Sequence, residues 1–115
     1  MKASRSRATS DSQRIDAVGR TAFIRSVIYQ LMQEKLSQSE ALRLLRIEVL
    51  GLKQDTYARL VDVSRKTISD IENNRGNYSV EVMNKVFRPF GLKVGLVPVS
   101  ASLLNSLLTP PDSQT

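Results

Sequence analysis

Residues 54–73 constrain the fold more than any other stretch, because they describe two short helices that share one small apolar core. Ala58 and Val61 are three residues apart in the first helix, and Ile68 and Ile71 have the same spacing in the second. Each pair therefore lies on one helical face. The small side chain of Ala58 allows the two backbones to approach closely. The stretch predicts a tightly packed pair of helices joined by a short turn.

The turn between the two helices contains Val63 and has its own signals. Asp62 lies where the chain must reverse, and aspartate tolerates a left-handed backbone better than most residues. Ser64 is a natural N-cap for a helix that begins at Arg65. The second helix then exposes a polar face: Arg65, Lys66, Thr67, Ser69 and Asp70. Such a face is typical of a recognition helix, whose first residues contact base edges in the major groove.

This stretch resembles the Cro/repressor-type (XRE family) helix-turn-helix. The shared pattern is a Gln, an Ala, a branched apolar residue after the turn, and then Ser-x-x-x-Ile-Ser-x-Ile-Glu-Asn. The matching residues are Gln54, Ala58, Val63, Ser64, Ile68, Ser69, Ile71, Glu72 and Asn73. The resemblance extends over about residues 39–92. It implies a mainly α fold, a lambda-repressor-like helical bundle, and binding to double-stranded DNA.

The sequence departs from the family pattern at two positions. Asp62 replaces the usual turn glycine, which is a mild change. The arginine usually found seven residues before Gln54 is replaced by Ile47, although Arg46 is its neighbour. The pattern therefore does not say which residue pairs with Glu72.

Composition excludes several classes of function. The 115 residues suffice for one domain with tails, and they include no Cys and no His. Thiol nucleophiles, disulfides, catalytic triads and most zinc sites are thereby excluded. The acidic residues are scattered singly, so we expect no enzyme, no cofactor and no metal. The net charge of +6 favours a polyanionic partner.

No apolar run approaches the roughly 20 residues that a membrane span needs, and the N-terminus lacks the apolar core of a signal peptide. We therefore expect a cytoplasmic protein that does not enter a membrane. Residues 1–12 predict a disordered basic arm. Either Lys2, Arg5 and Arg7 follow the DNA backbone or enter a minor groove, or the arm only adds solubility.

The predicted DNA-binding domain, residues 37–91, follows an N-terminal helix at residues 13–36. That helix has one apolar face, which packs on the domain or meets its copy in a second subunit; the face comprises Ile24, Val27, Ile28 and Leu31. Ser37 and Glu40 predict a capping box. In the helix that follows, Arg43 and Arg46 are expected on a solvated face. Ser79 is predicted to cap the last helix of the domain.

Residues 92–99 predict a β-strand, because they are apolar and β-branched without a helical period. A lone strand needs a partner, so we expect it to pair with the same strand of a second copy. The two recognition helices of such a homodimer, about 34 Å apart, match one turn of a palindromic operator. A terminal strand resembles the HipB-type antitoxin repressors. Residues 100–115 form a leucine-containing tail, either packed on the dimer or held for a partner protein.

The predicted contacts with DNA fall into two groups. Arg65 and Lys66 are expected to contact base edges, with Thr67, Ser69 and Asp70 as secondary candidates. Phosphate contacts are expected from Gln54, Ser64, Asn73, Arg75 and Asn77. The expected function is a dimeric repressor of its own operon, and the HipB-like resemblance further implies an antitoxin with a toxin partner. The alternative is a protein-interaction module in which the N-terminal helix or the leucine tail binds the partner and the helix-turn-helix is mainly a scaffold.

Overall fold

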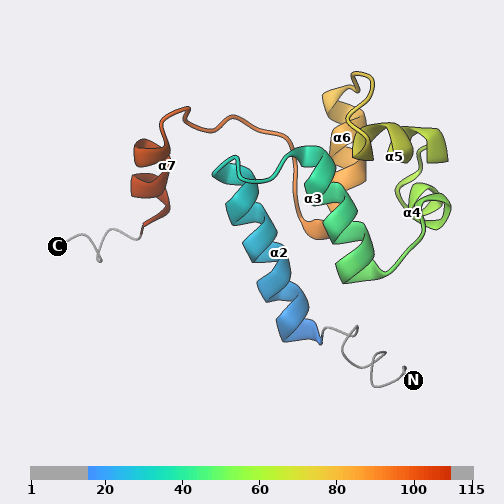
Figure 1. Cartoon of the computed structure of the whole chain (residues 1–115), viewed down its shortest axis with the longest axis horizontal. Coiled ribbons are helices and arrows are strands. Elements are labelled where there is room, and N and C mark those ends of the chain that lie inside the picture. The colour runs from blue at the N-terminus through green and yellow to red at the C-terminus, as the bar shows by residue number, and fades with distance from the viewer. Residues whose placement is uncertain (1–15, 110–115) are drawn as a thin grey trace.

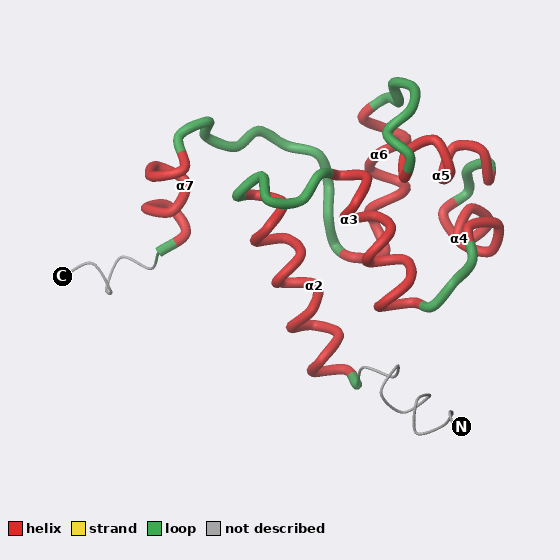
Figure 2. Tube along the Cα trace, in the orientation of Figure 1, coloured by secondary structure: helices red, strands yellow, loops and turns green. Residues whose placement is uncertain are grey.

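The computed structural model describes residues 16–109, so the predicted basic arm at residues 1–12 lies outside the described residues. Within that range the chain is all-helical (Figures 1 and 2). The helices are α2 (Ala17–Met32), α3 (Gln38–Leu44), η1 (Leu45–Leu50), α4 (Gln54–Val61), α5 (Arg65–Glu72), α6 (Val80–Phe87), η2 (Arg88–Phe90) and α7 (Ala101–Leu108). None of the described helices is long and apolar enough to cross a membrane. The mainly α prediction is confirmed.

The hydrophobic core lies where α3 and α4 pack against α5. Its buried members are Val27, Ala41, Leu42, Leu45, Tyr57, Ala58, Val61, Ile68, Ile71, Val86, Phe87 and Phe90. Tyr57 is fully buried, and its hydroxyl donates to the Val86 carbonyl. Its ring stacks on Phe90 with 6.1 Å between the centroids. This hydrogen bond gives the one buried phenol of the core a partner, as a buried polar group requires.

The predicted helix caps are present in the structure. The Ser37 hydroxyl accepts from the Glu40 N–H at 3.1 Å, and the Ser37 N–H donates to Glu40 Oε1 at 2.9 Å, so the capping box is confirmed. The hydroxyls of Ser64 and Ser79 likewise accept from the backbone N–H groups of Thr67 and Val82, and so cap α5 and α6. Asp62 has φ 62°, which confirms the left-handed turn between α4 and α5.

Helix α3 continues directly into η1, which is one turn of π-helix. The Arg46 side chain pairs with Glu72 of α5, with Nε 2.7 Å from Oε2. Arg46, in the first part of this turn, is only 7% exposed. The prediction that Arg46 lies on a solvated face is therefore wrong, whereas Arg43 is exposed.

Helix α2 packs on the domain, with Val27 in the core and Phe23, Ile24 and Leu31 against it. Of the two predicted arrangements for its apolar face, packing within the chain is thus the one that the structure shows. The helix begins at an Asp16 cap, whose carboxylate accepts from the Gly19 N–H at 2.7 Å.

The predicted strand at residues 92–99 is not formed in the described part of the chain. Figure 2 shows this segment as a loop leading to α7. No extended segment of the described chain lies beside it to complete a ladder, and the Val94 N–H donates instead to Asn84 Oδ1 at 2.8 Å. Leu96 and Val99 are fully exposed. Residues 101–108 of the predicted tail form α7, whose Leu104 is buried, and residues 110–115 lie outside the described residues.

Candidate nucleic-acid interface

Helices α4 and α5 form the helix-turn-helix unit that the spacing predicted. Ala58 is 2% exposed, and its carbonyl accepts from the Val63 N–H at 3.0 Å, which closes the turn. Lys85 of α6 donates to the Asp62 carbonyl at 3.3 Å. The turn is therefore held both from within and from a neighbouring helix.

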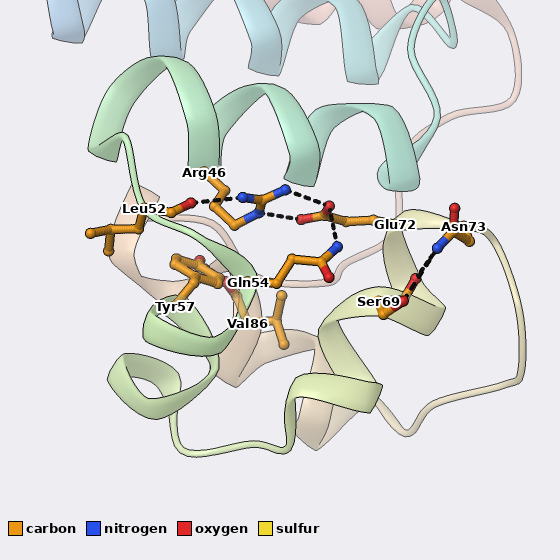
Figure 3. A network of polar contacts seen from close by, with 8 residues as sticks. All are labelled: Arg46, Leu52, Gln54, Tyr57, Ser69, Glu72, Asn73 and Val86. Atoms are coloured by element: carbon orange, nitrogen blue, oxygen red, sulfur yellow. Dashed lines mark hydrogen bonds and ion pairs between the residues drawn. The ribbon is translucent and has the colours of Figure 1, made fainter.

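A polar network at the C-terminal end of α5 fixes the buried face of this helix (Figure 3). The Glu72 carboxylate accepts from Arg46 Nε at 2.7 Å and Nη2 at 2.8 Å. The Arg46 Nη1 donates to the Leu52 carbonyl at 2.7 Å. This fork geometry is the strong form of an Arg–carboxylate pair. The hydrogen bond to Glu72 raises the pKa of Arg46, so the guanidinium stays charged. Arg46 therefore supplies the partner of Glu72 that the family pattern left undefined.

Gln54 belongs to the same network, because its Nε2 donates to Glu72 Oε1 at 3.0 Å. The side chain thus links α4 to α5, which the sequence pattern did not predict (Figure 3). A phosphate contact at Gln54 would come from its backbone N–H at the first turn of α4. That turn has no side-chain cap hydrogen bond from Lys53.

Two of the predicted DNA-contact residues bond each other at the N-terminus of α5. The Ser64 hydroxyl accepts from the Thr67 N–H at 3.1 Å and lies 2.9 Å from the Thr67 hydroxyl. Arg65 follows Ser64, and its side chain is exposed. Within residues 16–109 it makes no hydrogen bond or ion pair. Its guanidinium is therefore available to a ligand.

One turn further along α5, Lys66 and Asp70 form an ion pair, with Nζ 2.7 Å from Oδ2. The Tyr78 hydroxyl donates to the same Oδ2 at 2.8 Å, and Arg75 Nε lies 3.6 Å from Oδ1. Hydrogen bonds from Lys66 and then Tyr78 hold the pKa of Asp70 below its usual value. Asp70 is only 9% exposed. The expectation that it belongs to the exposed face is therefore wrong, because the loop after α5 folds back over it.

That loop, residues 73–79, places the remaining phosphate candidates beside α5. Asn73, Arg75 and Asn77 are all exposed. The Asn73 Nδ2 donates to the Ser69 carbonyl at 2.8 Å and to its hydroxyl at 3.3 Å, so Ser69 is already bonded and half-buried (Figure 3). Gly76 has φ 74°, which favours glycine, and a Cβ there would lie 3.3 Å from the Tyr78 ring.

Five of the ten residues expected to contact bases or phosphates occur together. They line one hollow and are Arg65, Lys66, Ser69, Asp70 and Arg75. The hollow joins α5 to the loop at residues 73–79 and contains three cationic side chains. Within residues 16–109, no group of three or more acidic side chains is placed to hold a metal ion. The chemistry of this surface is that of anion recognition.

Comparison with known proteins agrees with this geometry. Residues 42–97 match the family model HTH_3, described as Helix-turn-helix. The match spans α4, α5 and α6, together with most of the preceding helix. Neither the curated proteins nor the solved structures gave a match. The chain therefore contains an XRE-type helix-turn-helix domain, a domain of the DNA-binding class.

Proposed function

We propose that this protein is a sequence-specific transcriptional regulator that inserts α5 into the major groove of DNA. The observation that carries the proposal is the state of Arg65. It is exposed and unpartnered within the described chain, at the first position of a helix that is fixed at both ends. An arginine so placed can bond the two acceptors of a guanine edge, which is worth roughly 1–3 kcal/mol of discrimination.

The neighbouring side chains support the same orientation. Lys66 is 82% exposed, and its ion pair with Asp70 lies at the surface. The Lys66 ammonium can therefore exchange Asp70 for a base edge or a phosphate of DNA. Thr67 presents its methyl group on the same turn, while Ser64 and Ser69 are held by internal bonds. Arg75, Asn73 and Asn77 are proposed to fix the register on the phosphate backbone.

The exposed apolar surface after α6 supports a homodimer. Leu96 is fully exposed, and the segment from residue 94 to residue 109 contains no charged side chain. Residues 94–97 of this segment line a groove of about 560 Å³, together with Ile28, Leu31 and Phe87. An apolar segment and an apolar groove on one chain are both covered when two copies exchange contacts about a two-fold axis. Such a dimer would bind a palindromic operator with half-sites about 34 Å apart, and would repress by occupying its own promoter.

Helix α7 favours a second candidate partner. Leu103, Leu107 and Leu108 are at least 45% exposed, although Leu104 of the same helix is buried. Figure 1 shows α7 at the end of the molecule opposite α4 and α5. A protein bound there would leave the DNA-contact surface open. The toxin implied by the HipB-like resemblance is one such partner, and an interaction module without DNA binding is the alternative function.

The proposal is tested by comparing Arg65→Ala with the natural chain on two duplexes. One duplex carries the site enriched from a randomised library, and the other has random sequence. Fluorescence anisotropy should show a loss of roughly 5- to 150-fold on the enriched site, the equivalent of 1–3 kcal/mol. The loss on random DNA should be no more than about three-fold, the share of one phosphate contact.

Arg43→Ala is the matched control, because it removes an exposed arginine of α3 outside this surface. It should change neither affinity appreciably. Equal losses on both duplexes for Arg65→Ala would contradict the proposed contact with bases.

A further inference from the structure

Asp70 connects the recognition helix to the loop that follows it. Its carboxylate is bonded by Lys66 from one turn earlier in α5 and by Tyr78 from the far end of the loop. Arg75 contacts Asp70 in two ways. Its Nε lies 3.6 Å from Oδ1, and its backbone N–H donates to the Asp70 carbonyl at 2.7 Å. Two cations of the DNA-contact surface thus share one carboxylate.

This arrangement lowers the charge that the surface offers to a phosphate. Lys66 and Arg75 together carry two positive charges, and Asp70 offsets one of them. A phosphate that approaches either cation must compete with the Asp70 carboxylate. Fewer counterions are then released from DNA than two unpaired cations would release.

The effect is clearest on random DNA. Affinity for random sequence is almost entirely electrostatic, so it depends directly on the charge available to phosphates. Affinity for the operator also includes base contacts. Within residues 16–109, Arg65, the proposed base-contact residue, makes no hydrogen bond or ion pair with Asp70. A carboxylate beneath Lys66 and Arg75 therefore lowers affinity for DNA of any sequence, and random DNA offers no base contact to compensate.

We propose that Asp70 is a positioning residue, which restrains Lys66 and Arg75 and so limits the electrostatic affinity of this surface for DNA phosphates. This inference rests on the proposed DNA-binding function. Asp70 acts through its neighbours and contacts no base itself, since its side chain is only 12% exposed. Its carboxylate also holds the Tyr78 hydroxyl and so positions the loop at residues 73–79 against α5.

The experiment replaces the carboxylate by its amide in the full chain. Asp70→Asn keeps the shape and an acceptor for Tyr78 but removes the charge. Affinity for a random-sequence duplex should rise by about 3- to 10-fold at low salt. The slope of log affinity against log salt should become steeper by about 0.9 for each cation that gains a phosphate. Affinity for the operator should rise by a similar factor, so that the ratio of the two affinities changes little.

Glu48→Gln is the matched control. Glu48 is an exposed carboxylate of η1, and its replacement changes the net charge by the same amount outside this cluster. It should leave the salt slope and the affinity for random DNA unchanged. A result in which Asp70→Asn behaves like Glu48→Gln would overturn the inference, because net charge alone would then explain both. An unchanged slope for Asp70→Asn would overturn it as well.

A second pair of variants keeps the inference testable if Asp70→Asn unfolds. On random DNA, Arg65→Gln removes an unpartnered cation and should reduce the slope by about 0.9. Lys66→Gln removes a cation that Asp70 already offsets, so it should reduce the salt slope by less than half as much as Arg65→Gln does. Equal reductions would refute the restraint. If the natural chain shows no preference for any sequence, the proposed function itself fails. Sequence-specific binding without these slope differences refutes the role of Asp70 alone.

Discussion

Arg46→Met is the substitution whose cost follows most directly from the structure. The Glu72 side chain is only 2% exposed, and Arg46 supplies two of the three hydrogen bonds to its carboxylate. Gln54 supplies the third, at 3.0 Å. Methionine preserves the aliphatic bulk of Arg46 but leaves a buried carboxylate without a countercharge. It also leaves the Leu52 carbonyl without its donor.

The expected loss of stability follows from the difference between removing one partner of a buried ion pair and replacing both partners by apolar residues. Removing one partner costs about 3–5 kcal/mol, because the remaining charge is neither solvated nor paired. An acceptor that loses its hydrogen bond adds about 1 kcal/mol. A domain of this size has a total stability of about 5–15 kcal/mol, so a large part of it should be lost.

The double variant Arg46→Met with Glu72→Met separates the charge effect from packing. Because no buried charge remains, its stability should return to within about 2 kcal/mol of the natural chain. Urea unfolding followed by far-ultraviolet circular dichroism measures all three proteins. A loss below about 1 kcal/mol for the single variant would place the pair in the class of surface ion pairs and refute the reasoning. A double variant as unstable as the single one would refute it equally.

Further predictions concern the core tyrosine and the segment after the domain. Burial raises the pKa of Tyr57, so the folded state favours the neutral phenol. The stabilisation that results is fully present below the unfolded pKa of about 10 and is lost as the pH rises above it. Tyr57→Phe removes the hydrogen bond to the Val86 carbonyl and should cost about 1 kcal/mol of stability near neutral pH. In urea unfolding this deficit should shrink above about pH 10, because only the natural chain loses stability there. A deficit that stays constant with pH would contradict the prediction. A chain ending at Gly91 should sediment as a monomer while the full chain sediments as a dimer. If both are dimers, the interface lies elsewhere, with α2 as the first candidate; if both are monomers, the exposed segment serves a different protein.

The helix-turn-helix unit was predictable because its determinants are local. The spacing of Ala58, Val61, Ile68 and Ile71 set the shared core, and the Ser64 cap set the start of α5. The left-handed backbone at Asp62 follows from residue chemistry alone. The capping box at Ser37 is equally local. Each of these features depends on residues within a few positions of one another.

The remaining features depend on contacts that helical spacing does not encode. Arg46 was expected on a solvated face because a charged side chain is usually exposed, whereas its burial depends on pairing with Glu72, 26 residues away in the chain. Asp70 was expected on the surface because the return of the loop with Tyr78 could not be read from α5 alone. The bond from the Gln54 side chain to Glu72 joins two helices, so it could not be predicted from α4 alone. Residues 92–99 have the composition of a strand, yet a strand also requires a neighbour.

The central claim is that α5 reads a DNA sequence, and the most direct test is selection by the full chain from a library of randomised duplexes. We predict enrichment of one motif, with two inverted half-sites centred about 10 base pairs apart, as a two-fold dimer requires. Guanine should occur at the position that Arg65→Ala no longer selects. Retention of duplexes without any enriched motif, at an affinity set by salt alone, would contradict the claim.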